Sequence, residues 1–280
     1  MSLAHEAIDG LPSVEAELNY LAPMAERPRN YAGDPPPGVP STNAGRDLHR
    51  VAIHDMRPVS SGASLDEEGF AHVRQSSAVQ DFDDEDRIRR TYYPEAEALV
   101  RDATGADRVF IFDHVIRRHI LGMRDRRGGI RQPARRVHVD HTAASAPRRV
   151  RDFLPEEADE LLRGRVQFIN VWRPIHGPVR DAPLAVCHAL SVAPQDLVPT
   201  DLVYPDRIGE TYSVTYNPSH RWFYLAGMTP DETLLLKCYD SRTDGRARFV
   251  PHSAFDDPTA PPDTPRRESI ELRTMVFHLS

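Results

Sequence analysis

The sequence RRVHVDHT at residues 135–142 decides the fold, because it sets a histidine and an aspartate two positions apart in a short apolar strand. Valines alternate with His138 and Asp140, so a β-strand directs both polar side chains to one face and the valines to the other. One strand therefore predicts two metal ligands. The same alternation predicts that His141 points to the opposite face and is not a ligand.

A third ligand is expected from DETLLLKCYDSRTDGRARFVPHSAF at 231–255. The apolar run 234–239 predicts a strand, Asp-Gly at 244–245 predicts a turn, and His252 follows in a second strand, so we expect a hairpin. Two imidazoles and one carboxylate form a ligand set that leaves iron positions open for substrates. His220 is the rival third ligand, but the turn sequence Asn-Pro-Ser before it indicates a place near a pocket mouth.

The segment RESIELRTMVF at 267–277 adds a candidate anion site. A guanidinium pairs with a carboxylate through two parallel hydrogen bonds, so Arg267 with the nearby hydroxyl of Ser269 suits a dicarboxylate co-substrate. The alternating residues that follow predict a strand. These features together predict an enzyme with a non-haem iron centre.

Three further stretches carry a family resemblance: NVWRPIHGPVRDAPLAVC at 170–187, HRWFYLAGMTPDE at 220–232 and PHSAFDDP at 251–258. With the His-x-Asp strand they resemble the Fe(II)/2-oxoglutarate-dependent oxygenases. More narrowly, they are similar to the hydroxylase/desaturase family of the cephem-methoxylase small subunit, aspergillic-acid hydroxylase and gibberellin-desaturase-like proteins. The resemblance runs from about residue 18 to the C-terminus.

This resemblance implies a mainly β fold with bracing helices, a double-stranded β-helix of the jelly-roll, cupin-like kind. It implies Fe(II) at His138, Asp140 and His252, 2-oxoglutarate at Arg267 with Ser269, and O₂ as the oxidant. The interval before Arg267 contains PTAPPDTP and exceeds the common oxygenase spacing, so Arg266 and Arg273 remain alternatives for the co-substrate. The implied reaction is hydroxylation or desaturation of a small secondary metabolite, with release of succinate and CO₂.

Two other classes of protein share part of this pattern. A cupin-type enzyme that uses another divalent metal would need the three ligands but not Arg267. A non-catalytic accessory subunit would keep the barrel as an interaction surface for a tailoring-enzyme partner. A homodimer is the other association that we consider.

Composition bounds the remaining classes. A chain of 280 residues with 40% hydrophobic content can bury one large core, and the net charge of −7 argues against a nucleic-acid binder. No apolar run approaches the length of a membrane span, and the N-terminus lacks a secretory signal pattern. Two isolated cysteines predict no disulfide framework. We expect a cytoplasmic protein that does not bind membranes.

The chain is expected to have a Pro/Gly-rich extended arm over residues 1–45 and a single oxygenase domain over 46–280. Proline, glycine and apolar patterns predict local structure within that domain. Helices are expected over 81–91, 94–104 and 155–163, and strands over 108–116, 166–172 and 184–190.

Two segments have both a structural and a functional interpretation. The arginine-rich segment 124–136 and the arginines of 148–151 are either solvated loop or a lid that attracts an anionic substrate. Trp172 and Arg173 start a loop at the expected barrel mouth, where they either pack in the core or contact substrate. His220 is included with them as a candidate substrate contact.

Overall fold

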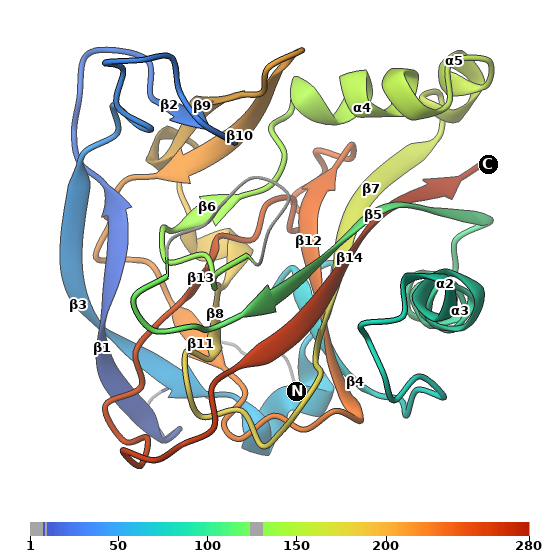
Figure 1. Ribbon diagram of the computed structural model, residues 1–280. Coiled ribbons are helices and arrows are strands. Elements are labelled where there is room, and N and C mark those ends of the chain that lie inside the picture. Colours follow the sequence, from blue (N-terminus) through green and yellow to red (C-terminus); the bar gives the residue numbers. More distant parts are fainter. Residues whose placement is uncertain (1–7, 9, 124–130, 280) are drawn as a thin grey trace.

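The computed structural model describes residues 8, 10–123 and 131–279, and it consists mainly of β-strands in two sheets (Figure 1). The larger sheet has the order β1-β3-β11-β8-β13-β6-β10-β9-β2, and the smaller has the order β4-β12-β7-β14-β5. Neighbouring strands are antiparallel except in the pairs β3–β11 and β2–β9. This mainly β architecture confirms the predicted jelly-roll class.

The strands of the larger sheet are β1 (Ser13–Leu21), β2 (Arg29–Tyr31), β3 (Arg46–Asp55), β6 (His138–Val139), β8 (Leu184–Cys187), β9 (Leu197–Val203), β10 (Ile208–Val214), β11 (Trp222–Tyr224) and β13 (His252–Ala254). Those of the smaller sheet are β4 (Phe70–Arg74), β5 (Arg108–Arg118), β7 (Arg165–Pro174), β12 (Glu232–Asp240) and β14 (Glu268–His278). Short 3₁₀ turns cover Arg57–Gly62, Ala189–Ser191 and Pro194–Asp196. The strand predicted over 184–190 therefore ends at Cys187, where the chain turns.

One helical run packs against the outer face of the smaller sheet (Figure 1). It comprises α2 (Glu85–Arg87), a π-helical segment (Ile88–Tyr92) and α3 (Tyr93–Thr104). The prediction of two separate helices is thus wrong, because the backbone continues through the π-helical turn just before Pro94. The predicted end is confirmed: Gly105 adopts φ 66° and closes α3, a conformation that glycine reaches without a Cβ clash.

The segment expected to be an arm contributes a strand to the larger sheet. Residues of β1 pair with β3 along the whole strand, and alternate side chains such as Leu18 and Tyr20 are buried. The Pro/Gly-rich part that follows contains only the short strand β2, which pairs with β9. The boundary at residue 45 stays a prediction, but buried core residues begin earlier, with Ile8 and the strand β1.

The hairpin predicted around 244–245 does not form. Strand β12 belongs to the smaller sheet and β13 to the larger, so the intervening chain crosses between the sheets. His252 is thereby placed in register with His138 on β6 and with Val186 on β8. This crossing brings the third predicted ligand to the first two.

Two helices cover one end of the barrel (Figure 1). α5 (Ala158–Leu161) lies within the helix predicted over 155–163, whereas α4 (Ser145–Phe153) replaces a predicted loop. The hydroxyl oxygen of Thr142 accepts hydrogen bonds from the backbone N–H groups of Ala144 and Ser145, at 3.2 and 2.9 Å, which starts α4. Among the described residues, no helix is both long and apolar enough to cross a membrane.

Candidate metal centre

His138, Asp140 and His252 converge although 112 residues separate the last two in sequence. One candidate ligand atom from each lies within 4.8 Å of the others. Strand pairing produces this approach, because β6 and β13 are neighbours and the two imidazole rings are 4.4 Å apart. The valines between and before the ligands are fully buried on the other side, as the alternation predicts.

The hydrogen bonds of both histidines favour metal binding. Nδ1 of His138 lies 2.8 Å from the carbonyl oxygen of Arg136, and Nδ1 of His252 lies 3.0 Å from that of Val250. A ring that donates from Nδ1 keeps a free lone pair on Nε2. Burial, and then the neighbouring His138, lower the pKa of His252 to about 4, so this ring is neutral at pH 7, the form that binds a metal ion.

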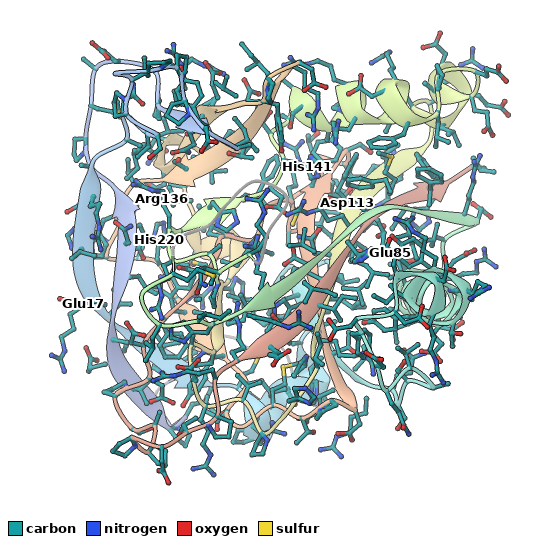
Figure 2. All side chains as sticks on the ribbon, in the orientation of Figure 1. Glu17, Glu85, Asp113, Arg136, His141 and His220 are labelled. Carbon is teal, nitrogen blue, oxygen red and sulfur yellow. The ribbon has the colours of Figure 1, made fainter. Side chains whose placement is uncertain are left out.

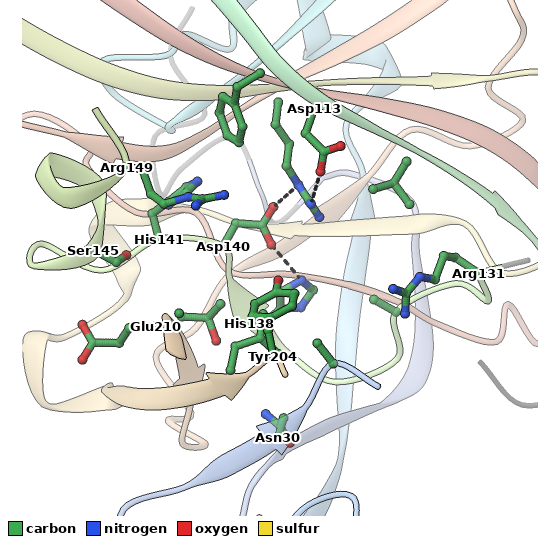
Figure 3. Close-up of a pocket in the computed structure, with 18 of the residues that line it drawn as sticks. Asn30, Asp113, Arg131, His138, Asp140, His141, Ser145, Arg149, Tyr204 and Glu210 are labelled. Carbon is green, nitrogen blue, oxygen red and sulfur yellow. Dashed lines mark hydrogen bonds and ion pairs between the residues drawn. The ribbon is translucent and has the colours of Figure 1, made fainter. Parts of the chain in front are cut away.

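Asp140 is oriented from the opposite sheet (Figure 3). Its Oδ1 lies 3.4 Å from Nε2 of His138, while Oδ2 accepts hydrogen bonds from Nδ2 of Asn170 at 2.8 Å and from Nε of Arg273 at 3.2 Å. Burial favours the neutral acid, but Arg273 and the two imidazoles outweigh it and hold the pKa of Asp140 well below its usual range. One carboxylate oxygen is thus free to face a metal ion. The sequence analysis assigned no role to Asn170, a buried amide on β7.

The two other histidines considered as ligands lie elsewhere. His141 is buried with its ring 4.3 Å from that of Phe168, and burial lowers its pKa to about 3. His220 pairs with Asp196 at 3.1 Å and stacks on Tyr20 at 5.8 Å. Figure 2 shows His141 and His220 in different parts of the molecule. Neither belongs to the three-residue cluster.

The three arginines considered for 2-oxoglutarate have different surroundings. Arg266 is about half exposed, with 45% of its side chain accessible, and pairs with Asp181. Arg273 is engaged by Asp140 and Asp113. Arg267 is only 3% exposed, and Ser269 beside it is also buried. Burial thus distinguishes Arg267 from Arg266, and among the described residues no carboxylate forms an ion pair with its side chain, unlike that of Arg273.

Arg267 is fixed by its surroundings but retains donor capacity. Its Nη1 donates to the carbonyl oxygen of Ala182, its backbone N–H donates to Asp181 at 2.9 Å, and its guanidinium lies 5.5 Å from the ring of Trp172. Its buried Nε has no hydrogen-bond partner among the described residues. Burial, and then Arg117, lower its pKa to about 9, so it stays a cation at neutral pH. A buried cation with an unused N–H fits a carboxylate ligand.

The candidate substrate contacts separate into two groups. Trp172 is buried and packs against Arg267, next to the candidate co-substrate site. Arg173 follows it on β7 and therefore points to the opposite face, where it donates to the hydroxyl of Tyr92 and the carbonyl oxygen of Pro230. Neither Arg173 nor His220 is among the described residues of the pocket beside the metal ligands. Their side chains form hydrogen bonds with other residues instead, so a substrate contact at Arg173 or His220 stays a prediction.

A pocket of about 1330 Å³, here called the main pocket, contains His138 and Asp140 in its wall. Other walls are formed by β5, by α4 and by the turn between β9 and β10. Of the arginine-rich segment 124–136, residues 124–130 lie outside the described residues, while Arg131, Arg135 and Arg136 line this pocket. The arrangement combines a candidate metal centre with space for a substrate.

Comparisons with known proteins agree with this geometry. A family model described as an oxidoreductase/YMDC permease-like domain matches residues 18–277. The hydroxylase/desaturase efuI of Hormonema carpetanum is 34% identical, with 95% of each chain covered. The Fe(II)/2-oxoglutarate-dependent dioxygenase nvfI of Aspergillus novofumigatus is also 34% identical, covering 94% of this chain and 96% of the relative.

A solved structure is similar over nearly the whole length. It is that of the iron and alpha-ketoglutarate-dependent endoperoxidase NvfI, with a TM-score of 0.86 and 32% identity, covering 95% of this chain and 98% of that one. The chain is therefore similar to these proteins in both sequence and fold. The chain belongs to the Fe(II)/2-oxoglutarate-dependent dioxygenases, in the family that contains the hydroxylase/desaturase enzymes.

Proposed function

We propose that His138, Asp140 and His252 bind Fe(II), and that Arg267 with Ser269 binds 2-oxoglutarate. The chain then hydroxylates or desaturates a C–H bond of a small secondary metabolite. The observation that carries this proposal is the approach of the three ligand atoms within 4.8 Å. When bound, iron and 2-oxoglutarate supply the oxidising chemistry, which consumes O₂ and releases succinate and CO₂.

The protein's own residues supply orientation, charge and exclusion of water. Asn170 and Arg273 hold one oxygen of Asp140, so the other is fixed toward the imidazoles. Arg267 offers a buried positive charge for the distal carboxylate of the co-substrate, and Trp172 covers one side of that guanidinium. Substrate enters by the main pocket, whose wall includes two of the three ligands.

The alternative functions predict different experimental results. A cupin-type enzyme with another divalent metal would keep its activity in Arg267→Ala. An accessory subunit would bind iron and 2-oxoglutarate weakly and would release no succinate alone. Relatives named as dioxygenases and hydroxylase/desaturases over almost the full chain favour the oxygenase.

An anaerobic titration of the apo-protein with Fe(II) and 2-oxoglutarate tests the proposal directly. The chelate gives a weak visible charge-transfer band, which we expect in the wild type and in His220→Ala but not in His252→Ala. His220 is a matched control because it is a buried histidine remote from the ligand cluster. A wild type without the band would contradict the oxygenase, and a band that survives in His252→Ala would contradict the assigned third ligand.

The sequence also predicts a cytoplasmic location and an association as a homodimer or with a tailoring enzyme. These remain predictions about the setting of the enzyme. A small molecule is the substrate class that the enzyme family supports. Size-exclusion chromatography with light scattering would measure the oligomeric state.

A further inference from the structure

The main pocket is larger than 2-oxoglutarate needs. Its volume of about 1330 Å³ exceeds the range of roughly 300–1,000 Å³ that holds drug-sized ligands. The co-substrate site assigned to Arg267 lies deeper, since Arg267 is 3% exposed and does not line the main pocket. The residues that line the main pocket therefore differ from those that surround Arg267.

The charge of this pocket is strongly positive. Nine arginines line it against four carboxylates, and each of the four already has a cationic partner. Asp113 and Asp140 pair with Arg273, Glu210 pairs with Arg27, and Asp152 pairs with Arg149. Arg118 and Arg135 also pair with carboxylates outside the pocket. Among the described residues, no ion pair engages four others: Arg131, Arg136, Arg148 and Arg207. An incoming anion would therefore meet uncompensated positive charge, whereas an incoming cation would find every carboxylate engaged.

Two of the arginines, Arg149 and Arg207, lie on separate walls of the pocket. Arg149 lies on α4, with its guanidinium 4.8 Å from the ring of Phe153, and it pairs with Asp152 only at 3.4 Å. Arg207, in the turn between β9 and β10, lies 3.9 Å over the ring of Tyr204. Within the described part of the chain, Arg207 has no carboxylate at ion-pair distance. Burial, and then the charge of Arg207, lower the pKa of Arg149. Both arginines line the main pocket, and α4 packs against β10, the strand that follows the turn containing Arg207.

Exposed apolar side chains lie next to both arginines. Ile208, next to Arg207, is 64% exposed, and Phe153, beneath Arg149, is 37% exposed. Both side chains belong to the wall of the main pocket. Exposed apolar side chains beside paired cations suit a ligand with an apolar skeleton and one charged end.

We propose that Arg149 and Arg207 form a subsite for an anionic oxygen group of the substrate, such as a carboxylate. Its apolar body would extend along Phe153 and Phe112 toward His138 and Asp140. An oxyanion that enters the main pocket between these two walls would be attracted by both positive charges and would accept charge-assisted hydrogen bonds from the guanidinium groups. This inference rests on the proposed function and narrows its substrate class to amphiphilic anions.

A pair of fluorescent dyes tests the subsite without knowledge of the natural substrate. The anion 1-anilinonaphthalene-8-sulfonate and the neutral N-phenyl-1-naphthylamine share one ring system and differ in the charged group. We expect Arg149→Gln and Arg207→Gln each to weaken binding of the anionic dye to the full chain by about tenfold, as loss of a charged hydrogen bond implies. Binding of the neutral dye should change less than about twofold.

Matched variants separate charge from packing. Arg151→Gln is the control, because Arg151 is on the same helix but pairs with Asp159 and does not line the main pocket. Arg149→Lys and Arg207→Lys keep the charge and should keep most of the affinity for the anionic dye. Equal weakening of both dyes, or unchanged binding of the anionic dye in both Gln variants, would overturn the proposal. Thermal unfolding shows whether each variant is folded. If Arg149→Gln does not fold, Arg207→Gln, which changes a residue in the turn between β9 and β10, tests the proposal.

Failure of the proposed function is measured separately. Wild type and Arg151→Gln are assayed for succinate formation from 2-oxoglutarate with Fe(II) and O₂. Absence of succinate in both, with charge-selective dye binding intact, would contradict the oxygenase and leave the anion subsite standing. Succinate formation without charge-selective dye binding would support the oxygenase and contradict the anion subsite.

Discussion

Nε of Arg273 lies 3.2 Å from Oδ2 of Asp140, so an arginine of the smaller sheet holds a candidate iron ligand that follows β6 of the larger sheet. The same guanidinium pairs with Asp113 on β5 at 3.1 Å. Asn170 on β7 reaches the same carboxylate oxygen at 2.8 Å. The metal centre is therefore built across the two sheets, and its geometry depends on their packing.

This relationship predicts that Arg273→Gln weakens Fe(II) binding. The substitution removes the positive charge that keeps Asp140 ionised and oriented, and loss of such a supporting contact costs roughly 10- to 100-fold in metal affinity. Anaerobic titration with Fe(II) measures the change. Arg118→Gln is the control, because Arg118 pairs with Asp83 and Glu268 instead. Equal affinities in both variants would show that Arg273 does not position Asp140.

Arg267→Gln is expected to weaken 2-oxoglutarate binding by roughly 10- to 100-fold, the effect of losing charged hydrogen bonds in a buried site. Fe(II) affinity should stay within about twofold of the wild type, since Arg267 contacts none of the three ligands. Arg266→Gln, which changes the adjacent exposed arginine, should leave both constants unchanged. Isothermal titration of the metal-loaded protein under nitrogen gives the two constants. Weaker 2-oxoglutarate binding in Arg266→Gln alone would reassign the site.

Lys237 should contribute to stability, not to activity. Its side chain is fully buried on β12, with Nζ 2.6 Å from Asp66 and 2.8 Å from Asp240. We expect Lys237→Met to lower the free energy of unfolding by about 3 kcal/mol, because removing one partner leaves buried carboxylate charge less well compensated. Arg246→Met, at the exposed edge of the same network, should cost less than about 1 kcal/mol. Urea unfolding compares them, and equal costs would contradict a special role for the buried lysine.

Glu232 predicts a pH dependence of stability. Burial favours its neutral form, but hydrogen bonds from Arg57 and Thr229 outweigh this and lower the pKa of Glu232 to about 2. A depressed carboxyl pKa stabilises the fold above the unfolded value near 4.5 and loses that contribution as the pH falls toward 2. Between these values we expect wild type to lose about 2 to 3 kcal/mol more than Glu232→Gln. Urea unfolding at several pH values measures the free energy of unfolding of both proteins. Equal losses in the two proteins over this pH range would refute the assignment.

The sequence by itself determined the features that depend on neighbours in the chain. Alternation within VHVD put His138 and Asp140 on one face, and Gly105 ended α3 through its positive φ. Family motifs spread from residue 18 onward indicated the jelly-roll and the cofactors before any contact was known. Each of these depends on local backbone geometry or on a pattern visible in the chain itself.

Only the tertiary structure decided the rest. The crossing from β12 to β13 placed His252 beside His138, where a hairpin would have kept it in the smaller sheet. Arg267 is buried whereas the adjacent Arg266 is about half exposed. Trp172 and Arg173 are consecutive on β7, so their side chains lie on opposite faces of the sheet. Strand partners and burial are set by packing between segments far apart in sequence. Local propensity does not encode that information, so three arginines alike in sequence acquire three different surroundings.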